Sequence, residues 1–372
     1  MSEGRYSLTE LKATLAGGLI PAVPVMFDRE HHFHERAHEA YVSFMSSQPI
    51  AGVAVWAHTG RGLLLDNETA QRVMREWRQG IADKPLIAGV GARNRDANPQ
   101  EATSATLAMA LAAGNYGADA LLVYPPSWLK HHAQRDSLII KHHESLANVG
   151  LPLVLFYLYE AAGGVRYTET VLDELLTLPN VIGIKMATLD SVMTYQDVAA
   201  QVRSRHPDKL LITGEDRFLG YSLRRGAQAA LIGMGAVCCD LQAELIEAHV
   251  AGNAQRFLEV SDLIDRLAEV LFVDPMEGYI GRILYALARL GVIPADAAND
   301  PWGPALTTSE LDNINTLLNT LNVHVGLCFL SSTDIRKLTR AIARRSRATT
   351  NASALVYPTV WKRMFASSTG SI

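Results

Sequence analysis

One lysine of this 372-residue chain stands in a setting that favours amine chemistry. Lysine is scarce, with eight residues against 26 arginines, and seven of the eight lie in polar or loop-like stretches. Lys185 alone is embedded in an apolar run, residues 181–186 (VIGIKM). Burial penalises the charged ammonium, so the neutral amine that attacks a carbonyl to form a Schiff base is favoured there. The alternative is a structural lysine whose head pairs with an acid such as Glu215 or Asp216.

The elements that position Lys185 follow from a repeated pattern. Eight short runs of aliphatic residues recur about every 30 residues, each bounded by Gly, Pro, Asn or Asp. They are nearly continuous rather than alternating, which is typical of parallel strands covered on both faces. Stretches with helical spacing of apolar residues, such as 68–82 and 168–178, lie between them. Alternating β and α elements with eight strands predict the α/β class and a (β/α)8 barrel, which places its chemistry at the carboxyl ends of the strands.

The barrel accounts for only part of the chain. We expect a lead-in over residues 1–16, the barrel over 17–238, and a C-terminal extension over 239–323. The extension shows three helical stretches, 240–272, 278–291 and 307–321, and the last has Thr308 or Ser309 as a plausible N-cap. Residues 324–372 differ in character and form a tail that we expect to be solvated and partly disordered.

Charge and composition limit the classes of function. Hydrophobic residues make up 48% and charged residues 19%, as expected of a folded globular protein. Residues 325–372 carry eight basic side chains and one acid, a net charge of +7, which leaves −11 on the rest. An acidic body argues against a nucleic-acid surface. The tail alternative, a membrane-surface or partner helix, rests on the stripe Ile335, Leu338 and Ile342.

The compartment is predicted from what the sequence lacks. No run approaches the ~18 apolar residues of a membrane span, and the first residues have no signal-peptide pattern. The three cysteines, Cys238, Cys239 and Cys328, form no disulfide framework. We expect a cytoplasmic protein without membrane or nucleic-acid partners.

Three motifs in order then point to one family. NVIGIKMAT around Lys185, Tyr157 placed 28 residues earlier in VLFYLYE, and AHTGR after the second strand resemble the dihydrodipicolinate synthase and N-acetylneuraminate lyase family. The resemblance covers residues from about Gly17 to Leu321. It implies a lysine-dependent, class I aldolase or lyase that acts on pyruvate or another 2-oxo acid and an aldehyde. It also implies no cofactor, a three-helix C-terminal extension, and a homo-oligomer, often a tetramer built from dimers.

The resemblance assigns roles to the two strand residues. Lys185 would form the imine, and Tyr157 would shuttle protons as water is expelled and the carbon–carbon bond is made or broken. A phenol needs a hydrogen-bonded neighbour to act as a base near neutral pH. The alternative for Tyr157 is an aromatic that fills the barrel interior, and Tyr159 is a weaker candidate for the same role.

The loop after the second strand departs from the family's usual Gly-Thr-Thr-Gly-Glu. Thr59 and Gly60 remain, so the carboxylate cradle of the family is still expected there. His58 replaces the first threonine, and its imidazole could do acid/base work itself or serve as a plain hydrogen-bonding residue. Arg61 could bind a carboxylate in a bidentate manner or pair with a neighbouring acid.

Other positions bear on the substrate. Gly214 and Ile232 match residues that line the keto-acid pocket, whereas Ala162 holds the place of the arginine that binds the aldehyde's carboxylate in the synthases. The double tyrosine after the fourth strand, which reaches a neighbouring subunit in the family, is Pro-Pro-Ser-Trp here, residues 125–128. Both losses argue against lysine-pathway synthase activity and leave the imine chemistry untouched.

Two other functions compete with the aldolase. One is a dehydratase or decarboxylase of a sugar-derived 2-oxo acid, with Arg61 on a distal carboxylate; the other is a barrel that has lost catalysis and serves as a binding protein. The glycine-rich turn after the eighth strand is weak evidence for a phosphate site. A metal is not expected, although His34 and His38 stand at i and i+4 beside His31 and His32.

Overall fold

The computed structural model describes residues 5–94 and 97–325, and eight parallel strands form its sheet in the order β1-β8-β7-β6-β5-β4-β3-β2. A parallel bridge between Ala22 and Ala54 joins the two end strands and closes the barrel. Each of the eight apolar runs contains one strand, so the predicted (β/α)8 barrel is confirmed. The strands are β1 (Leu19–Pro21), β2 (Val53–Val55), β3 (Leu86–Val90), β4 (Ala120–Val123), β5 (Leu153–Leu158), β6 (Val181–Ala187), β7 (Leu210–Thr213) and β8 (Ala229–Ile232).

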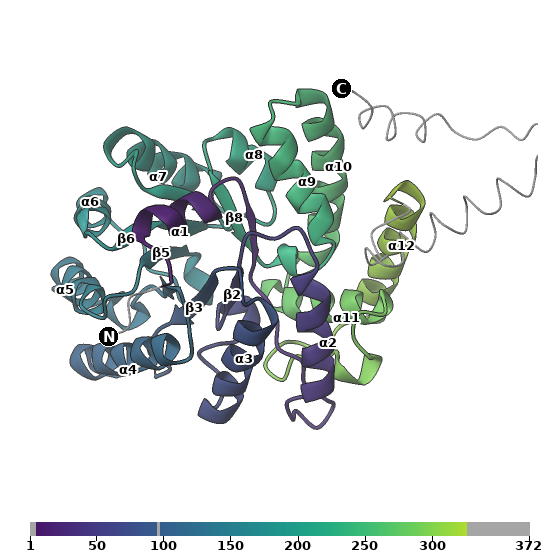
Figure 1. The fold of residues 1–372 in the computed structure, drawn as a ribbon, viewed down its shortest axis with the longest axis horizontal. Helices are drawn as coiled ribbons and strands as arrows, with labels where there is room; N and C mark the ends of the chain where they lie inside the picture. The colour runs from purple at the N-terminus through teal and green to yellow at the C-terminus, as the bar shows by residue number, and fades with distance from the viewer. Residues whose placement is uncertain (1–4, 95–96, 326–372) are drawn as a thin grey trace, which may run out of the picture. The chain divides into compact units, whose positions relative to one another are not determined.

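One helix follows each strand and covers the outside of the sheet (Figure 1). Polar side chains fix several starts: Asp66 caps α3 and Asn98 caps α4. The buried side of α3 consists of Val73, Met74 and Trp77 at helical spacing. The helices are α2 (Glu35–Ser46), α3 (Asn67–Gly80), α4 (Pro99–Asn115), α5 (Arg135–Ala147), α6 (Glu169–Thr177), α7 (Val192–Arg205), α8 (Leu219–Arg224) and α9 (Cys239–Val250).

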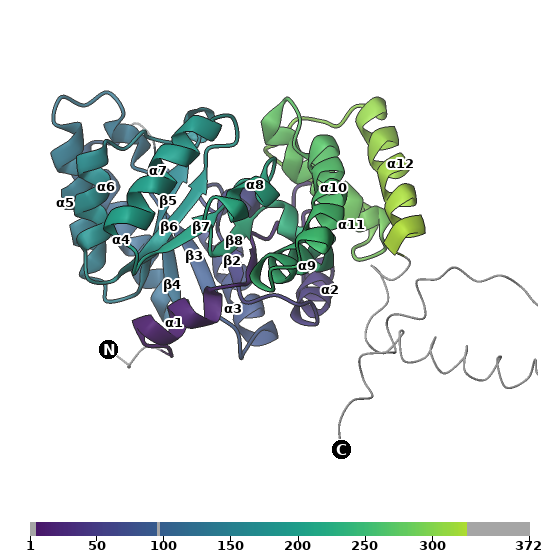
Figure 2. The same ribbon diagram turned by 90° about the horizontal axis from the view of Figure 1, so that it is seen from above.

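The lead-in contains a helix that belongs to the barrel core. Helix α1 (Leu8–Leu15) starts at a capping box formed by Ser7 and Glu10. Leu11 and Leu15 are fully buried and pack with the inward-facing residues of the strands. Figure 2 shows α1 at one end of the barrel. Leu11 and Leu15 therefore close that end of the barrel with apolar side chains.

The first helix predicted in the extension is two helices. Gly252 adopts a φ of +67° between α9 and α10 (Ala254–Leu271), a left-handed conformation that glycine tolerates and that ends α9. Because α9 packs on β1 and α8, it is the eighth barrel helix rather than part of the extension. The extension therefore consists of α10, α11 (Tyr279–Arg289) and α12 (Thr308–Val325).

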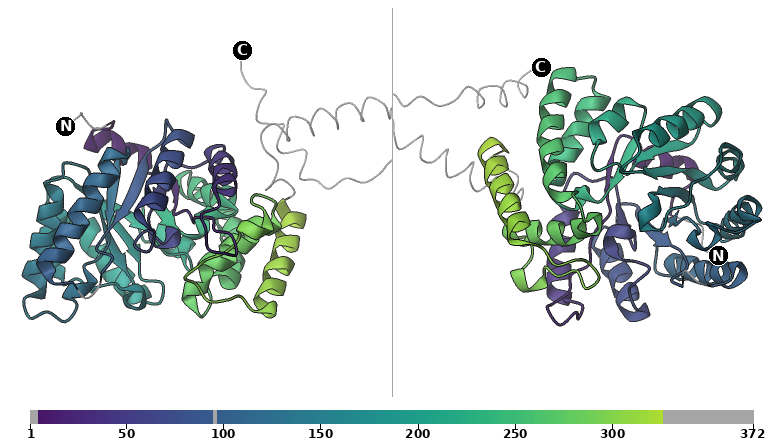
Figure 3. Two further views of the ribbon diagram at one scale, coloured as in Figure 1. Left: turned by 90° about the horizontal axis from the view of Figure 1, so that it is seen from below. Right: turned by 180° about the vertical axis from the view of Figure 1, so that it is seen from behind.

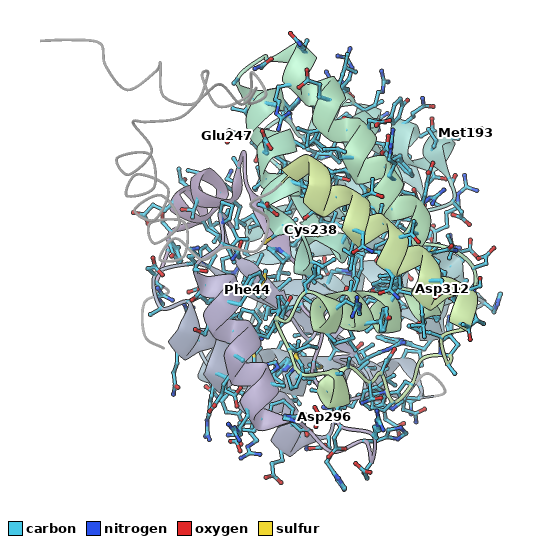
Figure 4. The ribbon with its side chains drawn as sticks, turned by 90° about the vertical axis from the view of Figure 1, so that its right-hand side faces the viewer. Phe44, Met193, Cys238, Glu247, Asp296 and Asp312 are labelled. Carbon is cyan, nitrogen blue, oxygen red and sulfur yellow. The ribbon has the colours of Figure 1, made fainter. Side chains whose placement is uncertain are left out.

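The extension lies beside the barrel. Figure 3 (left) shows α11 and α12 in yellow-green at one side of it, and in Figure 4 α12 with Asp312 lies in front of the other helices. Helix α12 packs on both α10 and α11. No helix of the described part is long and apolar enough to cross a bilayer. Past Val325, the predicted basic tail, including the Ile335 stripe and Cys328, lies outside the described residues.

Candidate functional site

Lys185 lies inside the barrel, near the carboxyl end of β6. Its side chain is 5% exposed, and its Nζ lies 4.3 Å from the centre of the Phe156 ring. Gly214 at the end of β7 leaves the space for it, since a Cβ on Gly214 would lie 2.6 Å from Lys185 Cε. Burial lowers the pKa of the Lys185 amine, and Asp216 and Glu215 offset part of that shift. The barrel thus holds an amine with an enhanced neutral fraction.

The two acids near Lys185 have other partners. Glu215 accepts hydrogen bonds from the backbone N–H groups of Thr188 (2.7 Å) and Leu189 (2.8 Å). Asp216 accepts one from the backbone N–H of Met234 (2.7 Å), and burial raises the pKa of both carboxyls. Within the described residues Lys185 forms no ion pair with either acid, so the structural alternative for this lysine is not realised.

Tyr157 does not face Lys185. On β5 the inward-facing residues are Val154, Phe156 and Leu158, so Tyr157 points to the outer face, where its ring packs edge-on against Tyr167. Phe156 rather than Tyr157 therefore lies beside Lys185, and the catalytic role expected of Tyr157 stays a prediction that this geometry does not favour.

A bulge explains the difference. Leu153 pairs with Val181 but Val154 pairs with Gly183, so Ile182 is an extra residue in β6. The extra residue lengthens the interval between the inward-facing aromatic and Lys185 from 28 to 29 residues and puts Phe156 directly opposite Lys185. Counting 28 residues back from Lys185 therefore leads to Tyr157, which is the neighbour of the inward-facing Phe156.

The loop after β2 brings His58 and Thr59 to a tyrosine of the extension. Thr59 Oγ1 lies 3.0 Å and His58 Nδ1 3.1 Å from the hydroxyl of Tyr279, the first residue of α11. The Tyr279 ring stacks between His58 and Phe272, with centroid distances of 6.0 and 4.7 Å. Burial raises the pKa of Tyr279 well above its usual value. Tyr279 thus joins the two loop residues that were expected to move protons.

Glu277, two residues before Tyr279, binds the other side of His58. Its Oε1 lies 3.3 Å from His58 Nε2 and accepts a hydrogen bond from the Tyr159 hydroxyl (3.0 Å). The hydrogen bonds from His58 and Arg61 hold the pKa of Glu277 well below its usual range. Because an ionised carboxylate only accepts, His58 carries its proton on Nε2 when neutral and presents a lone pair on Nδ1 to Tyr279.

Arg61 is held by two acids. Its Nη1 lies 2.7 Å from Glu277 and its Nη2 2.6 Å from Asp300, and the residue is 9% exposed. Its backbone adopts a φ of +51°, which is rare for a residue with a side chain and costs roughly 1–3 kcal/mol. The ion-pair alternative for Arg61 is therefore confirmed, and its two ion pairs join the loop after β2 to the extension.

The other predicted residues lie around the same mouth. Gly60 is buried, and its N–H donates to Ala57 O within the short 3-10 turn His58–Gly60. Ile232 is fully buried at the end of β8. Beyond the mouth, His34 caps α2 through Nδ1, and His38 is buried 3.9 Å from Glu76, so neither lies near the lysine.

A cavity of about 290 Å³ lies beside His58 and Arg61 at the barrel mouth. Tyr124, which lines it, also packs against Phe156, the residue beneath the Lys185 amine. The volume is at the small end of the range of ligand pockets, which suits small molecules. Its other linings include His58, Arg61, Arg93, Trp128, Ala162 and Glu277.

A sequence profile of the dihydrodipicolinate synthetase family matches residues 15–321. The chain belongs to this family. As a member it is an enzyme of the aldolase and lyase type. It is 27% identical over 313 residues to a 4-hydroxy-tetrahydrodipicolinate synthase of Bartonella tribocorum, which covers 83% of this chain and 98% of that protein. A synthase of Ruegeria pomeroyi is 27% identical over 312 residues, with coverages of 83% and 99%.

Solved structures agree on the family fold. The sialic acid aldolase of Ruminococcus gnavus, as a catalytic lysine mutant, superposes with a TM-score of 0.71 at 18% identity, covering 86% of this chain and 99% of that one. A prophage protein of E. coli K12 from the dihydrodipicolinic acid synthase family, determined with pyruvate, gives 0.71 at 21% identity, with coverages of 82% and 98%.

Relative to the family pattern, sequence reasoning missed Phe156, Glu277, Tyr279 and Asp300. The last three come from the extension, whose sequence signals only helices and loops, and they reach the site through tertiary packing alone. One feature of the sequence could have pointed to them: a closed barrel does not need three further helices for its own stability, so the extension could be expected to have another role.

Proposed function

We propose that the protein is a class I aldolase or lyase that forms a Schiff base between Lys185 and pyruvate or another 2-oxo acid. The proposal rests on a buried amine of lowered pKa that forms no ion pair among the described residues and whose side chain packs against Gly214. A neutral amine is the nucleophile that this chemistry needs, and the reaction requires no cofactor.

The steps follow from the amine. Lys185 attacks the keto carbon, water leaves, and the protonated imine withdraws electrons so that an enamine forms at the next carbon. The enamine then adds to an aldehyde, or arises by the reverse cleavage. Holding both partners in register can lower the barrier by roughly 7 kcal/mol or more.

The cavity suggests where the two substrates sit. We place the carboxylate of the 2-oxo acid at the turn that holds Thr59 and Gly60, and the aldehyde in the 290 Å³ cavity. Arg61 is committed to Glu277 and Asp300, which weakens the alternative in which it grips a distal carboxylate of a dehydratase or decarboxylase substrate.

The aldehyde is not expected to be that of the lysine pathway. Ala162 stands where the synthases carry an arginine, and Trp128 lines the cavity after β4. Phe156 opposite Lys185 also supports the alternative that the barrel has lost catalysis, because a phenyl ring there provides no hydroxyl group for proton transfer. We further propose that the protein is a cytoplasmic homo-oligomer, either a dimer or a tetramer. Light scattering would measure the mass of the oligomer.

Turnover with a panel of aldehydes tests the function. Pyruvate consumption followed by NMR should occur with at least one aldehyde other than that of the lysine-pathway synthases, and K185A should abolish it. K130A is a matched control, because Lys130 also lies near the mouth but pairs with Glu160 at 2.7 Å. Turnover that survives K185A would refute the Schiff-base mechanism. If the wild-type protein binds pyruvate but turns over with no aldehyde of the panel, the alternative of a binding protein without catalysis would be favoured.

A further inference from the structure

The extension places a hydrogen-bonded chain of four side chains at the barrel mouth. Glu277 binds His58 Nε2, His58 Nδ1 binds the Tyr279 hydroxyl, and that hydroxyl binds Thr59 Oγ1, with distances of 3.3, 3.1 and 3.0 Å. Each contact lies in or close to the range over which protons pass between heavy atoms. The order is carboxylate, imidazole, phenol and alcohol, with the alcohol innermost.

We propose that Tyr279 is the proton-relay residue of this enzyme, supplied by His58 and Glu277 and acting on the substrate through Thr59. The proposal rests on the proposed Schiff-base function. It assigns to a residue of the C-terminal extension the part that Phe156, lacking a hydroxyl, cannot perform.

The inner end of the relay lies at the same end of the barrel as Lys185. A Cβ on Gly233 would lie 3.1 Å from Thr59 Oγ1 and 3.0 Å from the Tyr279 ring, so the glycine lets both side chains pack closely against the backbone that follows β8. Asp216 binds the backbone N–H of Met234, the next residue, and its charge acts on both Lys185 and Tyr279. Gly214, which packs against Lys185, and Gly233, which packs against Thr59 and Tyr279, directly follow the paired strands β7 and β8, so the lysine and the relay lie at the same end of two neighbouring strands.

The proton balance closes over two steps. In the first, the Lys185 lone pair forms the N–C bond and the carbonyl π pair moves to the oxygen. One proton of the amine and one from protonated His58, relayed through Tyr279 and Thr59, pass to that oxygen, and the C–O bond breaks to release water and leave the protonated imine. In the second, the C–H bond next to the imine breaks, its electron pair forms C=C, and the imine π pair moves to nitrogen. The released proton returns through Thr59 and Tyr279 to His58, whose charged form Glu277 stabilises.

The fold holds the outer end of the relay in place. Arg282 of α11 is fully buried and donates to the carbonyl oxygens of Leu271 (3.1 Å), Val273 (2.9 Å) and Pro275 (3.2 Å). These bonds fix the segment that precedes Glu277 and Tyr279. Arg282 is therefore a positioning residue for the relay.

Exchange of the pyruvate methyl protons in D₂O, followed by NMR, tests the relay because it requires the imine and the enamine but no aldehyde. Y279F keeps the stacked ring and removes one oxygen, and we expect the exchange rate to fall about 100-fold or more. Y285F is the matched control on the same helix, because Tyr285 binds Asn315 instead, and it should exchange at the wild-type rate. E277Q should lower the exchange rate, because the His58 imidazole loses the carboxylate that holds its Nε2 side.

Trapping and exchange together distinguish failure of the Tyr279 relay from failure of the Schiff-base function. Reductive trapping of pyruvate on Lys185 in wild type, together with wild-type exchange in Y279F, would overturn the relay and leave the Schiff-base function intact. Absence of both trapping and exchange in wild type would overturn the function. An exchange rate of E277Q that matches wild type would remove His58 and Glu277 from the relay.

Discussion

Phe156 and Lys185 face each other across β5 and β6, with the amine nitrogen 4.3 Å from the centre of the phenyl ring. The ring excludes water from the amine and offers no proton. This pair explains why the lysine is buried with a lowered pKa and why proton transfer must come from another direction. That direction is the extension, which delivers Tyr279 to Thr59.

The rate of imine formation should increase with pH, and the increase should occur at a lower pH than the pKa of a free lysine side chain. A lysine with a lowered pKa is neutral, and therefore reactive, above that pKa and protonated below it. Because burial lowers the pKa of Lys185 from 10.5, the half-maximal trapping rate is expected at a lower pH than for a free lysine. Initial rates of cyanoborohydride trapping across pH give the midpoint, and a midpoint at or above 10.5 would contradict the account.

Tyr157→Phe should leave pyruvate exchange within about twofold of wild type, because the Tyr157 hydroxyl lies on the outer face of β5. Tyr279→Phe, measured in the same assay, provides the contrast. A large loss in Y157F with little change in Y279F would restore the role that the family resemblance gave to Tyr157.

Gly214→Ala should abolish trapping at Lys185. The new methyl group would lie 2.6 Å from Lys185 Cε and 2.8 Å from the carbonyl oxygen of Met186, and overpacking of this kind costs roughly 1–3 kcal/mol. Gly281→Ala is the control, because its methyl would meet only Leu306 at 3.6 Å or more, inside a helix where alanine is favoured. Mass spectrometry and urea unfolding of both variants give the comparison, and normal trapping in G214A would show that this space is not used.

Arg61→Ala should destabilise the protein by roughly 3–5 kcal/mol, because it leaves Asp300, whose side chain is 4% exposed, as a buried charge without its partner. Arg72→Ala removes an exposed pair with Glu35 and should cost at most about 1 kcal/mol. Equal losses in urea unfolding would show that Arg61 is free to bind a substrate carboxylate instead.

Local sequence was enough for the barrel, and long-range packing decided the site. Eight apolar runs predicted eight strands because a strand buried on both faces must be apolar throughout. The helix predicted over 240–272 broke at Gly252, whose positive φ the helical spacing of apolar residues did not reveal. Lys185 was found because a lysine inside an apolar run is costly unless it has a function.

The rest of the site depends on events that spacing does not record. A bulge of one residue in β6 exchanged Tyr157 for Phe156 as the inward-facing residue. Tyr279 joins His58 and Thr59 across more than 200 positions of sequence, which only the packing of the extension can bring about.

Reductive trapping shows directly whether Lys185 forms the Schiff base. Wild-type protein, K185A and K130A are incubated with pyruvate and borohydride, digested, and mapped by mass spectrometry. We expect one reduced pyruvyl adduct, on Lys185, in wild type and K130A, and none in K185A. Absence of an adduct in wild type with pyruvate and every other 2-oxo acid tried, or an adduct on a different lysine, would contradict this expectation.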